Sequence, residues 1–280
     1  MPLLTEEDVK SLATKPVINE TDSFDFYNPS QIFQEGFTGV SFETAYLEAL
    51  RFLNHVFEKI EADSGPYNFK GKRIVDFGSG WGRMLRLLRT RRELDETFLY
   101  GCEQHAGALR LCEKTVPRVC FSQTSSFPPC DLRSGFIDLV YAYSVFSHLN
   151  APPHLAWAQE IHRILKPGGY TCVTVQRRAF ISLCREYRDG SKPMQNNWHK
   201  LLSGAFLDEA DCLKRYDAGE LVFDYSTGGA GLTNDVYGDA IVPKAFFEKH
   251  WTRLGFRLVD FFEPPSNIHA QARVLLQKLP

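Results

Sequence analysis

The sequence predicts an α/β protein in which a mostly parallel sheet is covered by helices on both faces. An apolar strand signal at residues 73–77 runs into a glycine turn and then into a helix. Further apolar strand signals follow in order, beginning at residues 98, 119, 136 and 171. The chain closes with a helix and two strands, at 243–254, 256–262 and 272–278. Strands that alternate with helices along a chain are typical of parallel sheets.

The first strand and its turn indicate a nucleotide-cofactor site. Glycines stand at positions 78, 80 and 82, directly after the strand and before the helix. Glycine lets the backbone approach a ligand closely, and the helix that follows presents its positive N-terminal end to negative charge. The dinucleotide-binding fingerprint G-x-G-x-x-G also follows a strand. Here the spacing is G-x-G-x-G, and Asp76 precedes the first glycine by two residues.

The second strand ends in a carboxylate. Its apolar run, 98–102, leads into Glu103 and Gln104, and Glu103 lies 21 residues after Gly82. A carboxylate at this point accepts hydrogen bonds from ribose hydroxyls. The alternative is a solvated acid that happens to follow a strand. Because ribose is common to several cofactors, Glu103 indicates a ribose and not a reaction.

Three later segments complete the pattern. The third strand is followed by the polar loop Ser122, Gln123 and Thr124, and the fourth leads into the run Ser-Val-Phe-Ser-His-Leu at 144–149. A helix then ends in Leu-Lys-Pro-Gly-Gly at 165–169, where the proline stops the helix and the glycines permit a reversal before the fifth strand. This order of segments resembles the class I methyltransferases that use S-adenosylmethionine, over roughly residues 70 to 180. The wording Gly-Trp-Gly-Arg and Ser-Val-Phe-Ser-His-Leu resembles a bacterial subgroup found in sugar and secondary-metabolite pathways.

The resemblance implies a Rossmann-like fold with seven strands, the last of them antiparallel, and S-adenosylmethionine as cofactor. Asp76 is consistent with this cofactor, because a carboxylate can hold the ammonium of its methionine end directly or through water. Many members carry an acid in the third loop. This chain offers the Gln123 amide oxygen, a hydroxyl or a backbone carbonyl for adenine instead. The implied cofactor-binding residues are Asp76, Gly78, Ser79, Gly80, Trp81, Glu103, Gln104, Gln123, Thr124 and Ser144.

Four segments are expected along the chain: an N-terminal helical and cap segment at 1–69, the cofactor-binding core at 70–180, a substrate cap at 181–238 and a closing helix with two strands at 239–280. Residues 42–60 have the pattern of an amphipathic helix. The aromatic residues before it either fold over the cofactor, as such segments often do in the family, or cover the sheet edge; they are Phe24, Phe26, Tyr27, Phe33 and Phe37.

Composition agrees with one globular enzyme. The chain has 280 residues, is 44% hydrophobic and carries a formal charge of −2, which gives no sign of disorder or of a polyanionic partner. No run of eighteen apolar residues occurs and residues 1–19 lack the features of a signal peptide, so we expect a cytoplasmic protein without a membrane partner. The sequence does not indicate an oligomeric state.

Seven cysteines form no C-x-x-C pair, so neither a disulfide framework nor a metal site is predicted, and they are interpreted as small buried hydrophobes.

The helix after the glycine turn carries a row of arginines, which we interpret as a solvated helix face and not as a nucleic-acid track. Arg83 is the exception, since it lies beside the turn and can pair with a carboxylate of ligand or protein. The row consists of Arg83, Arg86, Arg89, Arg91 and Arg92.

Methyl transfer from a sulfonium is mainly a matter of positioning, and a base contributes when the acceptor is a hydroxyl. His148 is the candidate base, because the turn after the fourth strand borders cofactor and substrate at the carboxyl end of the sheet. The alternative is a histidine that only orients the turn. Weaker candidates are His199, His269, Tyr237 and Asp239. The predicted function is methylation of a small molecule at O or N; the alternatives are a catalytically inactive S-adenosylmethionine-binding partner subunit and an NAD-dependent oxidoreductase.

Overall fold

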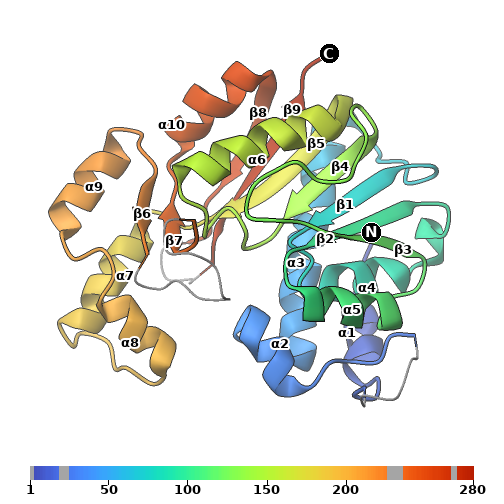
Figure 1. The fold of residues 1–280 in the computed structure, drawn as a ribbon, viewed down its shortest axis with the longest axis horizontal. Coiled ribbons are helices and arrows are strands. Elements are labelled where there is room, and N and C mark those ends of the chain that lie inside the picture. Colours follow the sequence, from blue (N-terminus) through green and yellow to red (C-terminus); the bar gives the residue numbers. More distant parts are fainter. Residues whose placement is uncertain (1–2, 19–24, 226–235, 266–269) are drawn as a thin grey trace. The chain divides into compact units, whose positions relative to one another are not determined.

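The computed structural model describes residues 3–18, 25–225, 236–265 and 270–280 (Figure 1). Within them the main sheet has seven strands in the order β3-β2-β1-β4-β5-β9-β8, and β9 runs antiparallel to β8. The sheet confirms the predicted seven-stranded, mostly parallel fold with an antiparallel last strand. No helix of the described residues is both long and apolar enough to span a membrane.

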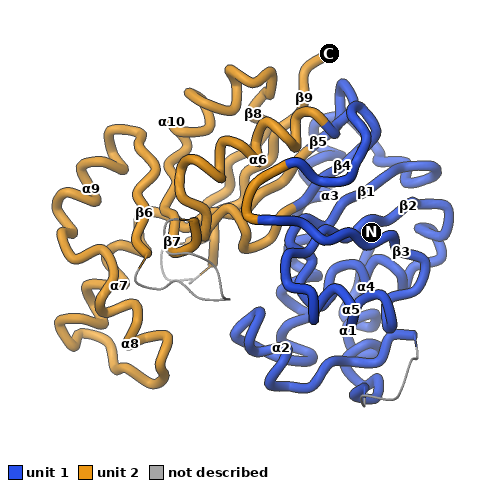
Figure 2. The backbone as a smooth tube through the Cα atoms, viewed as in Figure 1, with its two compact units in different colours: residues 1–125, 129–141, 164–170 blue, residues 126–128, 142–163, 171–280 orange. Residues whose placement is uncertain are grey.

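The chain forms two compact units (Figure 2). Unit 1 comprises residues 1–125, 129–141 and 164–170, and unit 2 comprises residues 126–128, 142–163 and 171–280. The elements up to β4 are α1 (Glu6–Ala13), α2 (Gln31–Thr38), α3 (Phe42–Ser64), β1 (Arg73–Phe77), α4 (Arg83–Arg89), a 3-10 turn (Arg92–Leu94), β2 (Phe98–Glu103), α5 (Ala106–Thr115), β3 (Val119–Gln123) and β4 (Ile137–Ala142). Those that follow are α6 (Ala151–Ile164), β5 (Leu165–Val175), α7 (Ala179–Arg188), α8 (Asn197–Ser203), α9 (Glu209–Asp217), β6 (Val222–Asp224), β7 (Asp239–Ile241), α10 (Lys244–Phe246), a π-helical turn (Phe247–Trp251), a 3-10 turn (Thr252–Leu254), β8 (Phe256–Phe262) and β9 (Ala272–Lys278).

In unit 1 the parallel strands bring their carboxyl ends to one edge. Asp76 of β1 lies opposite Gly101 of β2 and Tyr141 of β4. Helix α3 confirms the helix predicted at 42–60, extends it by one turn to Ser64, and contacts α1, α2 and α4. Its Phe52 ring lies 6.1 Å from the Tyr141 ring in an edge-on arrangement. The apolar face of α3 is therefore buried against the centre of the sheet.

In unit 2, the first turn of helix α6 contains two prolines, which have no backbone N–H to donate. The Asn150 side chain accepts a hydrogen bond from the Ala151 N–H at 2.7 Å, and Pro152 and Pro153 stand in the first turn, whose N–H groups lack intrahelical partners. Helices α7, α8 and α9 share a core of their own with β6 and β7. This region overlaps the segment 181–238 for which a substrate cap is predicted, and its elements are mostly helical.

The interpretation of the arginine row as a solvated face is wrong for Arg86 and Arg89, whereas Arg92 is exposed. Arg83, Arg86 and Arg89 are buried, Arg86 completely. The Arg86 guanidinium donates to the backbone carbonyls of Trp81 and Tyr27 and to the Thr115 hydroxyl. A guanidinium carries five donors, so one buried arginine can tie three chain segments together without leaving its charge unsolvated. The sequence shows only a helix rich in arginine, and the carbonyls that bind it come from distant segments.

Two boundaries also differ from the sequence expectation. Strand β5 begins at Leu165 and not at Thr171, so the Leu-Lys-Pro-Gly-Gly run belongs to the strand and the helix ends before Pro167. Gly168 has φ +77°, a conformation that favours glycine.

Six of the seven cysteines are buried, as expected, and Cys120 is exposed.

Candidate cofactor and catalytic sites

The glycine turn of unit 1 is fastened to the neighbouring strand β2. Gly78, Gly80 and Gly82 all have positive φ, which explains the alternating glycines. The N–H groups of Gly78 and Ser79 both donate to the Cys102 carbonyl, at 2.8 and 3.0 Å. These two amides therefore hold the turn in place and do not point to a ligand. The glycine pattern in the sequence does not distinguish these two roles.

Glu103 bridges the glycine turn and the start of α5. One carboxylate oxygen accepts the Gly80 N–H at 2.6 Å, and the other accepts the His105 N–H at 2.7 Å. Glu103 is buried, so the alternative of a solvated acid after a strand is wrong. A carboxylate offers about four lone-pair sites, so two remain for hydroxyl donors such as those of ribose.

Asp76 is a buried acid at the carboxyl end of β1. Burial raises the pKa of the Asp76 carboxyl well above its usual value, Arg83 opposes the rise, and the nearby Glu103 carboxylate adds to it. Arg83 itself donates to the Glu48 carboxylate at 3.0 Å and to the Ala45 carbonyl at 3.1 Å. Arg83 thus pairs with a carboxylate of the protein, which is one of the two kinds of partner expected for it. The anionic form of Asp76 would be stabilised by a further positive group.

Two polar atoms beside the turn have no hydrogen-bond partner among the described residues. They are the Ser79 hydroxyl and the indole N–H of Trp81, and both side chains are buried. The Trp81 ring contacts the Tyr46 ring edge-on at 5.2 Å between centroids. Buried polar groups are normally paired, so unpaired ones beside a glycine turn are expected where a ligand completes the site.

An aromatic wall from α2 covers the turn. The Phe37 ring lies 3.3 Å from the position that a Cβ on Gly80 would occupy. The same ring contacts His105 edge-on at 5.4 Å and Phe33 at 5.2 Å between centroids. Phe37 therefore lies against the glycine turn and Phe33 packs beside it, whereas Phe24 falls outside the described residues.

The loop after β3 is tied to the end of β2. The Thr124 N–H donates to the Glu103 carbonyl at 3.0 Å, and the Gln123 side-chain amide donates to the Gln104 carbonyl at 3.2 Å. Since the amide nitrogen of Gln123 is used in this way, its amide oxygen is the acceptor that it can offer to an adenine amino group. The structure thus brings Gln104, Gln123 and Thr124 together with Glu103.

His148 lies at the centre of a second cluster, in unit 2. It stands in the turn before α6 and not within the helix. Its Nδ1 lies 2.7 Å from the Gly238 carbonyl oxygen and 3.6 Å from the buried Asp239 carboxylate. Its Nε2 lies 3.3 Å from the Ser144 hydroxyl, and its ring stacks on Tyr237 at 4.9 Å.

Tyr237 and Asp239, proposed from sequence as weaker candidates, thus belong to the His148 cluster. His199 does not: its ring stacks on Tyr187 at 4.3 Å, and its Nδ1 accepts the Gln195 N–H. His269 lies outside the described residues. Sequence reasoning missed Gln271, whose side chain donates to the Ser144 hydroxyl at 3.0 Å. Nothing in its local sequence marks it, because the contact joins residues far apart in the chain.

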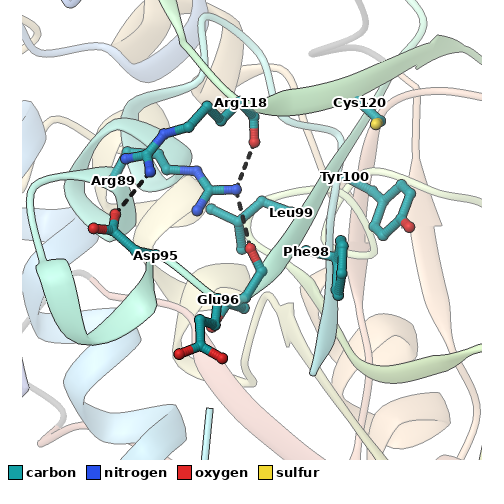
Figure 3. A pocket seen from close by; sticks show the side chains of 9 residues that line it. Arg89, Asp95, Glu96, Phe98, Leu99, Tyr100, Arg118 and Cys120 are labelled. Carbon is teal, nitrogen blue, oxygen red and sulfur yellow. Dashed lines mark hydrogen bonds and ion pairs between the residues drawn. The ribbon is translucent and has the colours of Figure 1, made fainter. Parts of the chain in front are cut away.

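A separate cavity of about 230 Å³ lies at the other ends of β2 and β3 (Figure 3). It is lined by the amino-terminal half of β2 and by Arg89, Asp95, Arg118 and Cys120. None of the sequence-predicted site residues lines it. Arg118 pairs with Asp95 at 2.8 Å, and Arg89 donates to backbone carbonyls, so the charged groups of this cavity are engaged within the protein.

Comparison with known proteins gives the following relationships. Residues 75–173 match a family model described as a methyltransferase domain. No curated protein sequence matches the chain. Among solved structures, the chain resembles an S-adenosylmethionine dependent methyltransferase from Mesorhizobium loti, with 12% identity, TM-score 0.51, and coverage of 76% of this chain and 93% of that one.

Two further solved structures resemble the chain to a similar degree. A protein described as an S-adenosylmethionine dependent methyltransferase from Listeria monocytogenes has 13% identity and TM-score 0.52, covering 81% of this chain and 100% of that one. PKMT2 from Rickettsia typhi, solved in complex with AdoHcy, has 14% identity and TM-score 0.52, covering 82% of this chain and 52% of that one. At these identities the resemblance establishes the fold.

Proposed function

We infer, from the premise that residues 75–173 of this chain are a methyltransferase domain, that the protein transfers a methyl group from S-adenosylmethionine to oxygen or nitrogen of a small-molecule acceptor. The observation that carries the inference is the arrangement around the glycine turn. Asp76, Glu103 and the Gln123 loop stand at the carboxyl ends of β1, β2 and β3, where open α/β sheets bind their ligands.

The residues present fit this cofactor. The buried Asp76 carboxyl has a raised pKa, so an ammonium group beside it would stabilise the anion. Glu103 retains acceptor capacity for ribose hydroxyls, and the unpaired Ser79 hydroxyl and Trp81 N–H offer polar contacts. When bound, S-adenosylmethionine supplies an electrophilic methyl group. The protein then has to hold the acceptor about 3–3.5 Å from that methyl and exclude water.

We propose His148 as the base that takes the acceptor proton. A backbone carbonyl can only accept, so the contact with Gly238 places the proton of a neutral His148 on Nδ1. Nε2 then carries the lone pair. The buried Asp239 carboxylate, 3.6 Å from Nδ1, would stabilise the imidazolium that forms on proton transfer. Support for an oxygen or nitrogen acceptor comes from this base, because these acceptors lose a proton when methylated.

Calorimetric titration with S-adenosylmethionine, S-adenosylhomocysteine and NAD tests the cofactor. We expect binding of the first two and none of NAD. Incubation with methyl-labelled S-adenosylmethionine and a panel of hydroxyl- and amine-bearing small molecules then tests the reaction. Binding without transfer to any panel member would favour an inactive partner subunit, and binding of NAD alone would contradict the proposal.

A further inference from the structure

Ser144 is held in an unusual conformation two residues after β4. Its φ is +59°, a region that serine rarely adopts and that costs free energy. Its N–H donates to the Thr174 hydroxyl of β5 at 2.7 Å. The turn after β4 is thereby fixed to the neighbouring strand by a side chain. A strained residue that is held in this way often lies at a functional site.

Hydrogen bonds run from Ser144 through two side chains and back to its own hydroxyl. The Thr174 hydroxyl donates to the Gln271 amide oxygen at 2.5 Å. The Gln271 amide nitrogen donates to the Ser144 hydroxyl oxygen at 3.0 Å. The Ser144 hydroxyl in turn lies 3.3 Å from Nε2 of His148.

Two backbone groups and the orientation of the Gln271 amide set the directions of the bonds in this network. The Ser144 N–H can only donate, so the Thr174 oxygen accepts from it and the Thr174 proton turns to Gln271. Gln271 must then present its amide oxygen to Thr174 and its nitrogen to Ser144. At the other end the Gly238 carbonyl can only accept, so a neutral His148 carries its proton on Nδ1 and its lone pair on Nε2. The Ser144 proton therefore points to Nε2.

We propose that Ser144 relays the acceptor proton to His148, and that Gln271 is the positioning residue that keeps the Ser144 hydroxyl turned toward the imidazole. A hydroxyl has one proton and two lone pairs. Gln271 occupies one lone pair of Ser144 and His148 receives the proton, so the second lone pair is left for an acceptor O–H or N–H. This proposal rests on the proposed methyl transfer.

In the proposed step the acceptor loses one proton and His148 gains one. The acceptor O–H or N–H bond breaks and its proton joins the Ser144 oxygen, while the former Ser144 proton moves to Nε2 and forms an imidazolium. The electron pair of the broken bond forms the new bond to the methyl carbon, and sulfur keeps the pair of the broken C–S bond. His148 then releases its proton to water.

The network can be tested without cofactor or acceptor by labelling with diethyl pyrocarbonate, which reacts with the free lone pair of a neutral imidazole. In Gln271→Glu a carboxylate replaces the amide, accepts from Thr174 and Ser144 alike, and draws the Ser144 proton away from Nε2. We expect His148 to be labelled at least threefold faster than in the native protein, as measured by peptide mass spectrometry with His199 as internal reference. Ser144→Gly, which suits φ +59° and lacks the hydroxyl, should have the same effect.

The matched control is Gln277→Glu on β9, which introduces the same charge where the side chain faces Arg257. It should leave His148 labelling unchanged. Thr174→Val provides a second break in the network if Gln271→Glu does not fold. Equal His148 labelling rates in the native protein, Ser144→Gly and Gln271→Glu would overturn the network.

Turnover tests the relay itself. With an acceptor whose methylation falls in His148→Gln, Ser144→Gly should lose turnover at least tenfold, measured at saturating S-adenosylmethionine. Full turnover in Ser144→Gly with such an acceptor would overturn the relay. Failure of S-adenosylmethionine to bind would contradict the proposed function but would not alter the labelling result, so the two failures are distinguishable.

Discussion

Single residues at the carboxyl ends of β1 and β2 combine structural roles with the ligand-binding roles that we propose for them. Glu103 holds the glycine turn and the start of α5 with its two oxygens, and Asp76 is an acid with a raised pKa in a buried position. Loss of the structural role would disturb the local fold, whereas loss of the ligand-binding role would lower cofactor affinity alone. Conservative variants therefore separate loss of a ligand contact from loss of the local fold.

Glu103→Ala should weaken S-adenosylmethionine binding about tenfold or more, because a charged hydrogen bond contributes roughly 1.5–3 kcal/mol. Glu103→Gln keeps an acceptor for one of the two backbone N–H groups, so it should weaken binding less. Calorimetry on both variants measures the effect, and circular dichroism reports whether the turn survives. Native affinity in Glu103→Ala would remove this residue from the site.

Asp76→Asn should raise the melting temperature and weaken cofactor binding. Since the pKa of Asp76 is raised in the folded protein, its ionised form destabilises the fold, and this cost appears as pH rises above about 3.9, the usual value for Asp. Asparagine removes the cost, while Arg83 keeps Glu48 as its partner. Each kcal/mol gained should raise the melting temperature by roughly 2–4 °C.

The control for this variant is Asp95→Asn, which removes a half-exposed carboxylate paired with Arg118. It should change neither property appreciably, since exposed ion pairs contribute about 0–1 kcal/mol. A lower melting temperature in Asp76→Asn would mean that the anion stabilises the fold and that its charge is already compensated.

His148→Ala should reduce turnover far more than cofactor affinity, because the lost interaction belongs to the transition state. A base contributes on the order of 10²–10⁴-fold. His148→Gln retains hydrogen bonding but cannot take a proton at neutral pH. Comparison of kcat for the two variants separates an orienting role from a basic one, and near-native kcat in both would leave methyl transfer to positioning alone.

At the scale of elements, α2 and the glycine turn are packed so closely that a substitution in one affects the other. A Cβ on Gly80 would lie 3.3 Å from Phe37, and Gly80 has φ +53°. A side chain at this position would therefore press against Phe37 as well as restrict the space beside the turn. The position thus needs a paired test.

We expect Gly80→Val to abolish S-adenosylmethionine binding with most of the fold intact. Its β-branched side chain restricts the turn and occupies ligand space. The paired test is Gly80→Ala with and without Phe37→Ala, followed by calorimetry and circular dichroism. Binding should stay impaired in the double variant. If Phe37→Ala restores native affinity, then Gly80 serves the packing of α2 and not the ligand.

At the scale of the whole molecule, acid stability depends on a histidine buried in unit 2. His154 of α6 is fully buried among aromatic rings and accepts the Trp251 indole N–H at 3.1 Å. Burial lowers its pKa to about 3, and His250 contributes to the shift. Protonation of His154 would place an N–H on the ring nitrogen that accepts from Trp251, so two N–H donors would face each other. The folded protein therefore keeps this residue neutral.

The free energy of unfolding should therefore fall as pH decreases from about 6.5 toward 3, because the unfolded chain binds a proton there that the folded protein does not. The slope from one group is at most about 1.4 kcal/mol per pH unit. His154→Gln keeps an acceptor for Trp251 and does not titrate, so urea unfolding of this variant should depend less on pH over that range. An unchanged slope would show that His154 is protonated in the folded protein.

The sequence by itself determined the alternation of strands and helices, the glycine turn and the carboxylate after β2, because these depend on residues close in the chain. Helix α3, β8 and β9 were predictable for the same reason: apolar spacing is a local property. The residues proposed for the cofactor site were inferred from their types and their order along the chain, and their roles stay a prediction.

Only the tertiary structure decided which side chains meet. Ser144 and Gln271 are 127 residues apart, and His148 and Gly238 are 90 apart. The burial of Arg86 depends on a carbonyl 59 residues away. Such contacts leave no periodic signal, since a hydrogen bond needs only one donor and one acceptor, and folding of the chain into the sheet and its connections brings these together. The proposed relay therefore depends on strand pairing and turn geometry, whereas the glycine turn is encoded locally.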